Sequence, residues 1–417
     1  MTMDAKALAA AIVAVASAGV LARPWRTPAA AWAAGGAVLL VALGLAPLSL
    51  ALDQLGASGD VCLFLTGMML LSETARREGL FDVLAAIAVS GCGGSRTRLF
   101  ALVYGAGVVV TVFLSNDATA VVLTPAVYAA ARKAEADPLP HLFSCAMVAN
   151  AASFVAPISN PANLVLFASH PPPLAAWAGR FAFPSAVSIG ATFLALWQAE
   201  RGGLKGGCQS EAELQPLTRG GWAALGGLAL TLIALIACSA AGVQLGVPTA
   251  ALGLATAALT LAIGHGSPWK LVGGVSWSIL PLVAGLFVMV GALERIGLIG
   301  WLGAALGAGA RTLATPTAWL AGAGVAIGSN LVNNLPAALA ASAAAEAARA
   351  PEKIRDALLI GVDLGPNLSV TGSLATLLWL AALKREGEHV SAWRFLRTGA
   401  IVMPPALALA LAARLLV

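Results

Sequence analysis

The sequence predicts an all-α polytopic membrane protein, an inverted repeat with five spans and one re-entrant hairpin in each half. Of the 417 residues, 59% are hydrophobic and 10% are charged, and the mean hydropathy is +0.88. This composition excludes a soluble surface. Two apolar stretches, 113–125 and 328–336, carry Ser and Asn, and each precedes an apolar segment interrupted by Pro, Gly, Asn and Ser, at 157–163 and 361–373. Non-helical backbone at membrane depth is tolerated only where protein or a cavity satisfies it, so paired breaks indicate the substrate site of a secondary transporter.

The individual elements follow from hydropathy, since a span needs about 20 apolar residues. Between the third and fourth spans of each half lies further apolar sequence that is polar at its centre, 98–132 and 313–348, and we interpret each as a re-entrant hairpin with the Asn motif at its tip. The fourth span of each half, 141–168 and 354–380, is predicted to be a discontinuous helix. The spans are expected at 5–22, 29–49, 59–75, 141–168 and 179–199 in the first half, and at 220–241, 247–264, 276–293, 354–380 and 396–416 in the second.

The domain organisation follows from this pattern. Residues 1–199 form the first repeat, 200–219 a Gly-rich and charged linker, and 220–417 the second repeat. Five spans per half is an odd number, so the halves enter the bilayer in opposite senses. Charged motifs after the third span of each half, at 73–81 and 290–298, predict a short helix along the membrane surface in both repeats.

The positive charge indicates orientation. The formal net charge is +5, but the 24 Lys and Arg residues lie mainly at the ends of apolar segments. That placement fits membrane topology and not nucleic-acid binding. If 98–132 and 313–348 are hairpins, most basic residues fall on one side, which is then the cytoplasm, together with the linker 200–219. Both termini are then expected outside.

Two acidic residues fall within the interrupted elements, Asp117 and Asp363. A charge at such depth costs several kcal/mol unless it is hydrated or paired, so intramembrane carboxyl groups are functional hypotheses by default. A carboxyl group avoids this cost by taking up a proton, which makes both residues candidates for proton coupling. The alternative is that either carboxylate caps a half-helix by accepting backbone N–H bonds.

Neutral polar side chains surround these acids. Hydroxyl and amide groups both donate and accept hydrogen bonds, which suits a small polyhydroxyl solute or a desolvated cation. No Lys or Arg is expected at these depths, which disfavours a large anion. About half of the set is expected only to tie the hairpin tips to the broken helices. The candidate substrate-binding residues are Ser115, Asn116, Thr119, Ser159, Asn160, Asn163, Asn330, Asn333, Asn334, Asn367, Thr371 and Ser373.

Enzymatic and cofactor-binding motifs are not evident in the sequence. The five cysteines are scattered, without a CxxC pair that would indicate zinc, and the four histidines lie near span ends or in loops. No glycine-rich ATP-binding motif and no Ser–His nucleophile arrangement occurs. We therefore expect no cofactor, no fixed metal and no catalytic residue.

Three motifs resemble one known family. Residues 361–379 with 395–399, the segment 116–125 and the segment 333–336 are similar to the arsenite efflux permeases, ArsB, of the ion transporter superfamily. The resemblance implies export of As(OH)3 and Sb(OH)3 from the cytoplasm in exchange for protons, in a bacterial inner membrane. It also implies a fold with scaffold and mobile transport regions, and a soluble ATPase as a partner to consider. Where this family often carries Asp in the first broken span, this chain has Asn150, and Cys145 is a candidate for transient contact with arsenic.

Two other functions remain open. A sodium/proton antiporter or a sodium-coupled anion transporter of the same superfamily would use the Asn carbonyls and unwound backbone to bind Na⁺. A structural or receptor membrane protein without transport would carry the same helix breaks as packing features only.

Overall fold

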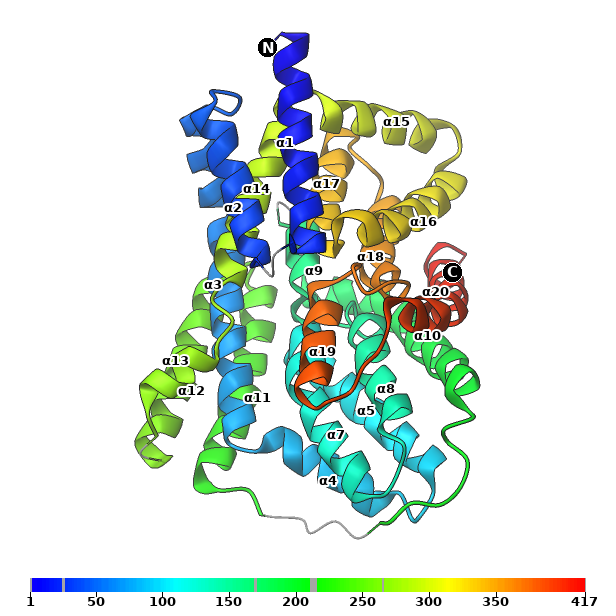
Figure 1. Ribbon diagram of the computed structural model, residues 1–417. Helices are drawn as coiled ribbons and strands as arrows, with labels where there is room; N and C mark the ends of the chain where they lie inside the picture. Colours follow the sequence, from blue (N-terminus) through cyan, green and yellow to red (C-terminus); the bar gives the residue numbers. More distant parts are fainter. Residues whose placement is uncertain (1, 25–26, 169–170, 211–215, 265, 417) are drawn as a thin grey trace.

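The computed structural model describes residues 2–24, 27–168, 171–210, 216–264 and 266–416, and within these ranges it is helical with no β-strand (Figure 1). Eight helical segments in the described ranges are long and apolar enough to cross a membrane. They are Met3–Ala22, Leu48–Arg77, Arg96–Phe113, Leu174–Glu200, Arg219–Ala240, Gly246–Gly264, Pro268–Arg295 and Ala392–Leu415. The predicted class, an all-helical polytopic membrane protein, is confirmed.

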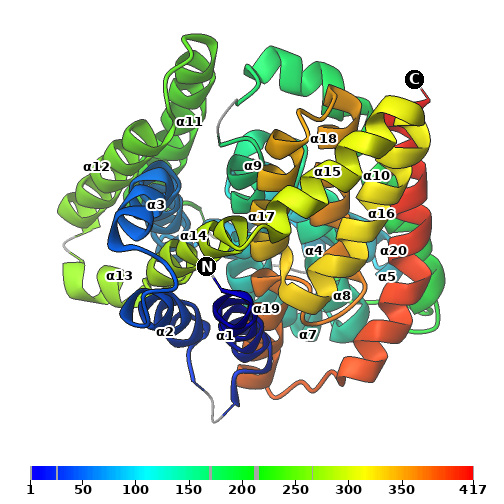
Figure 2. The same cartoon turned by 90° about the horizontal axis from the view of Figure 1, so that it is seen from above.

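The helices form two bundles that lie side by side in Figure 2. In the first bundle, small residues allow close helix contact: a Cβ added at Gly67 would meet the backbone of α12, and one at Gly285 would meet the backbone of α2. The first bundle consists of α1 (Met3–Ala22), α2 (Ala29–Ala42), α3 (Leu48–Arg77), α11 (Arg219–Ala240), α12 (Gly246–Gly264), α13 (Pro268–Gly274) and α14 (Ile279–Arg295).

The second bundle contains both helix–turn–helix elements and both interrupted helices. Its most extensive helix pairs are α10 with α20 and α16 with α18. From the first half it takes α5 (Arg96–Phe113), α6 (Asn116–Ala118), the π-helical turn Thr119–Leu123, α7 (Thr124–Lys133), α8 (Pro138–Ala151), the 3₁₀ turn Pro157–Ser159, α9 (Pro161–Leu166) and α10 (Leu174–Glu200). From the second half it takes α16 (Ala314–Val332), α17 (Asn334–Ala347), α18 (Glu352–Leu364), the 3₁₀ turn Gly365–Asn367, α19 (Leu374–Arg385) and α20 (Ala392–Leu415).

Two helices connect the bundles at opposite ends of the molecule, α4 (Leu80–Gly91) and α15 (Leu298–Thr312) (Figure 1). Each follows a glycine in the left-handed region, Gly79 at φ 77° and Gly297 at φ 90°, where residues with a Cβ are strained. Each glycine ends a long helix and allows the chain to turn. Both helices occur where the charged motifs after the third span predict a short helix.

The predicted boundary between the second and third spans is wrong. The second helix ends earlier than the expected span 29–49, and the third begins earlier than the expected span 59–75, because α2 stops at Ala42 and α3 begins at Leu48. Gly44 has φ 68°, and Pro47 stands at the N-cap of α3. Glycine permits the left-handed turn, and proline is tolerated at a helix start but not within a helix. The apolar run therefore contains a turn that hydropathy does not resolve.

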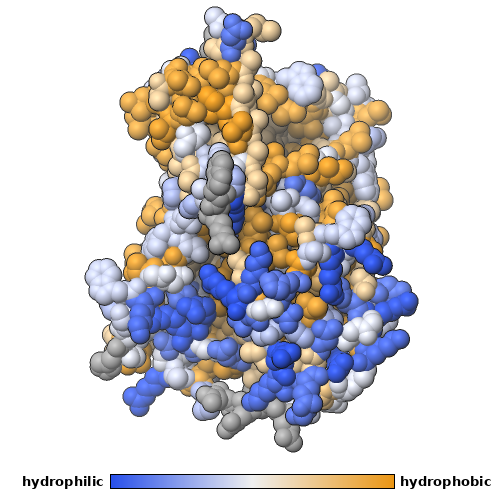
Figure 3. Space-filling model, viewed as in Figure 1, coloured by the Kyte–Doolittle hydropathy of each residue, from blue (hydrophilic) through white to orange (hydrophobic). Residues whose placement is uncertain are grey.

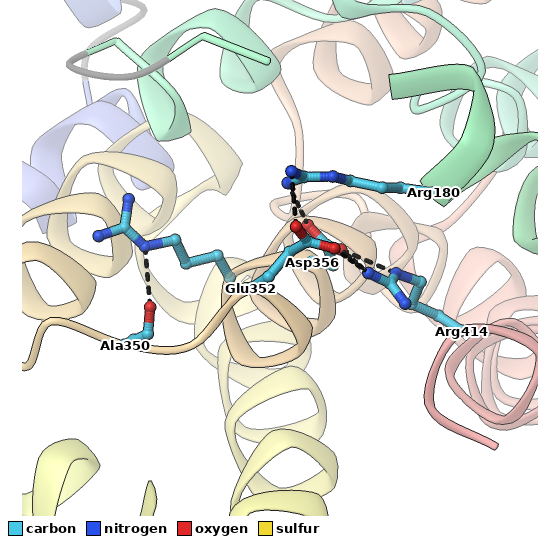
Figure 4. Close-up of polar contacts among 6 residues, drawn as sticks. Arg180, Ala350, Glu352, Asp356 and Arg414 are labelled. Carbon is cyan, nitrogen blue, oxygen red and sulfur yellow. Dashed lines mark hydrogen bonds and ion pairs between the residues drawn. The ribbon is translucent and has the colours of Figure 1, made fainter. Parts of the chain in front are cut away.

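Polar and apolar residues separate along the long axis on the face that Figure 3 shows. In Figure 3, hydrophobic residues dominate the upper part of the visible face, and hydrophilic residues gather at the lower end, where α4 lies. Two ion-pair groups join α10 to α20. At one end Glu200 pairs with Arg394 at 3.7 Å, and at the other end Arg414 pairs with Asp356 on α18 (Figure 4).

The group around Asp356 is the more buried of the two. Asp356 is fully buried, and its Oδ2 accepts a hydrogen bond of 2.7 Å from Nε of Arg414. Arg180 approaches Asp356 Oδ1 at 3.7 Å and Glu352 Oε2 at 2.6 Å. Figure 4 shows these charges converging from α10, α18 and α20. These ion pairs hold the ends of α10 and α20 against α18, which is the first part of the second interrupted helix.

Candidate functional site

The tips of the two helix–turn–helix elements share an unusual backbone. Ser115 has φ 151° and Asn333 has φ 76°, and both have extended ψ. Non-glycine residues seldom adopt this region, and such strain clusters at functional sites. Both side chains compensate locally, since Ser115 Oγ accepts from the N–H of Ala118 at 3.3 Å and Asn333 Oδ1 accepts from the N–H of Leu335 at 3.4 Å. Each tip thus begins a new helix directly after the strained residue.

The two interrupted helices contact each other at their breaks. Asn160 Nδ2 donates to Asp363 Oδ1 at 2.7 Å, and Asn150 Nδ2 donates to Asn367 Oδ1 at 2.9 Å. Asn367 Nδ2 in turn donates to the carbonyl of Met147 at 3.0 Å. All of these polar side chains are buried. The hydrogen bond to Asp363 therefore fixes the orientation of the Asn160 amide.

The second tip is tied to the break in the second half. Asn330 Nδ2 donates to the carbonyl of Gly365 at 2.9 Å, and Asn330 Oδ1 accepts from the hydroxyl of Ser369 at 2.7 Å. Thr371 Oγ1 donates to the Asn330 carbonyl at 2.9 Å, and its own carbonyl accepts from Asn333 Nδ2 at 3.3 Å. The sequence predicts Asn330 and Thr371 as substrate ligands. In the structure, the Asn330 amide and the Thr371 hydroxyl are hydrogen-bonded to other residues of the protein.

A small cavity lies where both tips and both breaks meet. Its volume is about 30 Å³, enough for one or two water molecules. Asn116 Oδ1 has no hydrogen-bond partner among the described residues. The structure thus brings Asp117 and the Asn333–Asn334 pair to one cavity. Its predicted polar lining residues are Asn116, Asp117, Asn160, Asn333, Asn334 and Ser373.

A larger cavity of about 600 Å³ opens between the two bundles. Asp117 lines it as well and is the one acidic residue common to both cavities in the described part of the chain. From there the larger cavity extends to Glu73 and Arg76 at the end of α3 and to Arg385 at the end of α19. A solute in this space can reach Asp117 from that end of the molecule.

The prediction that no Lys or Arg lies near the site is wrong. Arg23 lines the small cavity together with Asp117. Helix α1 ends at Ala22, and Arg23, at φ 44°, turns the chain next to the breaks of the second bundle. Glu73 is also buried, in an ion pair with Arg76 beside the larger cavity, and sequence reasoning did not select it. The sequence signal for Glu73 is a carboxylate inside the mostly apolar run 61–75. Arg23 gives no such signal, because it resembles any basic residue at the end of a span.

Several predicted ligands do not face the small cavity. Thr119 Oγ1 pairs with the hydroxyl of Thr111 at 2.8 Å, and Ser159 Oγ donates to the carbonyl of Val112 at 3.2 Å. Asn163 Nδ2 donates to two carbonyls, at 2.7 and 3.1 Å. Cys145 is fully buried in α8 and lines neither cavity. Ser159 and Asn163 thus satisfy backbone carbonyls near the breaks, whereas Thr119 is paired with another side chain.

Two helical bundles that enclose a polar cavity between opposed helix breaks define a membrane transporter and not an enzyme. The citrate transporter family, CitMHS, matches residues 8–362, and the chain belongs to this family. It is 28% identical over 370 residues to an arsenical pump membrane protein of Escherichia coli, with 83% of each chain covered. It is 24% identical over 381 residues to an uncharacterized transporter of Mycobacterium tuberculosis, with 85% of each covered. The resemblance to the arsenite permeases is thereby confirmed.

Solved structures show the same fold. The Alcanivorax borkumensis YdaH transporter superimposes with a TM-score of 0.55 at 17% identity, covering 88% of this chain and 86% of the other. Neisseria gonorrhoeae MtrF, from a class of antimetabolite efflux pumps, gives a TM-score of 0.55 at 15% identity, covering 90% and 84%. At these identities the likeness concerns the fold alone.

Proposed function

We propose that this protein exports arsenite and antimonite, as As(OH)3 and Sb(OH)3, across a bacterial inner membrane in exchange for protons. The observation that carries the proposal is the composition of the small cavity, where Asp117 stands among four Asn side chains and Ser373. The match to arsenical pump membrane proteins over most of the chain supports the same substrate.

The chemistry of the solute fits this lining. Arsenous acid is mostly neutral at pH 7 and presents three hydroxyl groups, each of which donates and accepts. Asn amides supply both kinds of partner, and the free Oδ1 of Asn116 is available to a hydroxyl donor. Cysteine thiols, which would hold trivalent arsenic too tightly for turnover, do not line the small cavity in the described residues.

Asp117 supplies the coupling in this proposal. A proton on its carboxyl removes a charge that is costly in a poorly hydrated site, whereas release of the proton creates an acceptor for the solute. Proton and metalloid therefore compete for one position at the boundary of the two cavities. Asp363 acts through Asn160, to which it is hydrogen-bonded, as a positioning residue. Movement of the second bundle relative to the first, through the connections α4 and α15, would expose the site alternately to each side.

The test is transport in everted membrane vesicles that contain no soluble ATPase, so that any uptake belongs to this chain alone. We expect arsenite uptake when the vesicle interior is acidic and its collapse when the pH gradient is removed. Vesicles from cells carrying the empty vector provide the background. Uptake that depends on a sodium gradient and ignores the pH gradient would contradict the proposal.

A second candidate, a sodium-coupled anion transporter, is favoured by one observation. Arg23 brings a cation to the small cavity, and no hydrogen-bond partner for its Nε occurs in the described residues. The citrate transporter family to which the chain belongs is named for an anion. Arg23→Gln distinguishes the two functions: it should abolish uptake of a carboxylate such as citrate, whereas uptake of neutral arsenite should change little.

A further inference from the structure

The linker between the two repeats is held against the second bundle by its backbone. Gly207 pairs with Ser95 in an isolated antiparallel bridge, and the N–H of Cys208 donates to the carbonyl of Gly94 at 3.0 Å. Arg96 Nε donates to the carbonyl of Gly207 at 2.8 Å. The linker therefore lies on the turn that joins α4 to α5.

This arrangement brings two cysteines from distant parts of the chain together. The sulfur atoms of Cys92 and Cys208 are 3.4 Å apart, and both thiols are free. Cys92, at the end of α4, is fully buried, whereas Cys208 in the linker is half-buried and reachable from outside. Neither residue lines the cavities that contain Asp117.

We propose that Cys92 and Cys208 form a binding site for a trivalent metalloid, separate from the transport cavities. As(OH)3 condenses with the two thiols to give a dithiolate, (RS)2As–OH. Two As–S bonds form, two As–O and two S–H bonds break, and each thiol proton leaves with a hydroxide as water. Arsenic stays trivalent, so the step needs no oxidant or reductant. The site goes beyond the proposed transport function and does not depend on it.

The surroundings favour condensation over a disulfide. Burial raises the pKa of the Cys208 thiol to about 11, and the neighbouring Cys92 contributes to the shift. A thiolate is the nucleophile in disulfide exchange, so Cys208 is a slow nucleophile toward oxidants. The linker is also expected on the cytoplasmic side, where thiols are kept reduced. Condensation with As(OH)3 starts from thiols and releases only water.

Binding would join two chain segments that connect the bundles. Helix α4 leads from the first bundle into α5, and the linker leads from α10 back to α11. An arsenic atom bonded to both sulfur atoms would fix the linker to the end of α4. The site therefore lies where it can restrict relative movement of the bundles.

The experiment uses the purified full-length chain and phenylarsine oxide, which bonds to two thiols with loss of one water. We expect one phenylarsenic group per chain by mass spectrometry, and protection of the reachable Cys208 from maleimide labelling. A second thiolate raises affinity through its effective concentration, so Cys208→Ala and Cys92→Ser should each weaken binding by roughly 100-fold. Cys62→Ser and Cys238→Ser, in which other partly buried cysteines are removed, are the controls and should bind as the wild type.

Cys208→Ala is the decisive variant, because its half-buried position tolerates truncation better than that of Cys92. Wild-type affinity in Cys208→Ala would overturn the proposal, and so would a Cys92–Cys208 disulfide in protein isolated under reducing conditions. Loss of vesicle uptake in Cys208→Ala would show that the pair lies on the transport route, which contradicts a separate site. Since thiol protection is measured without transport, it stays positive even if the proposed arsenite export fails.

Discussion

Asp117→Asn separates coupling from binding in the proposed exchange. Asparagine keeps the size of the side chain and one acceptor oxygen, but it cannot titrate. Asp117 lines both the small and the large cavity, whereas Asp363 is fully buried and bonded to Asn160. We therefore expect one exchanged proton per metalloid, carried by Asp117.

The size of the effect follows from this single carboxyl group. A proton that moves across a difference of one pH unit contributes about 1.36 kcal/mol, which corresponds to a ten-fold concentration ratio. Exchange of a neutral solute for one proton moves one charge, so the membrane potential adds about 2.3 kcal/mol per 100 mV and must be clamped. The logarithm of the accumulation ratio should then rise by about one for each pH unit in the wild type.

The assay measures arsenite accumulated at steady state in everted vesicles at several imposed pH differences, with potassium and valinomycin to hold the potential at zero. Asp117→Asn should abolish the slope while arsenite still equilibrates down its gradient. Asp363→Asn, which retains an acceptor for Asn160, is the control and should keep a slope of about one. A slope near two in the wild type would show that Asp363 also exchanges a proton. An unchanged slope in Asp117→Asn would refute this role for the residue.

Further predictions concern packing, charge and topology. Gly361→Ala should lower the free energy of unfolding by about 1–3 kcal/mol, because the added Cβ would meet the backbone of α16. Gly324→Ala has open space around the added Cβ and should be neutral. Thermal unfolding in detergent compares the two variants. Arg414→Met should lower the free energy of unfolding by about 3–5 kcal/mol, because it leaves the buried carboxylate of Asp356 with a weaker partner. Arg394 is more exposed, so Arg394→Met should lower it by about 0–1 kcal/mol in the same assay. Equal losses within either pair would contradict these assignments. A reporter active only in the cytoplasm should stay silent at the C-terminus, and a signal would invalidate the topology.

The helix breaks could be predicted because their causes are local. Pro161 and Pro366 interrupt hydrogen bonding, and Asn160 and Ser373 cap the helices that follow them. Ser115 and Asn333 lie at the tips that the Asn motifs indicate. Residue type alone therefore locates the non-helical backbone around which the site forms.

The roles of individual polar residues were less predictable. Asn116 and Asn330 are equally plausible ligands in the sequence, but Asn330 bonds to Gly365 and Ser369 while Asn116 Oδ1 stays unpaired among the described residues. An amide satisfies backbone and solute by the same hydrogen bonds, so only the fold separates the two uses. Arg23 was missed for a related reason, since its position depends on where α1 ends against the other bundle.

The cavities, combined with the predicted topology, assign the described conformation to one step of the transport cycle. Arg76 and Arg385 line the larger cavity at the end remote from Asp117, and the predicted topology expects both on the cytoplasmic side. With that orientation, the 600 Å³ cavity admits solute from the cytoplasm as far as Asp117, and the 30 Å³ cavity must widen before the solute reaches the four Asn side chains that line it. A protein that exports the solute would, in this conformation, take it up from the cytoplasm. The opposite orientation would make the same conformation the releasing state, in which Asp117 takes up its proton from outside.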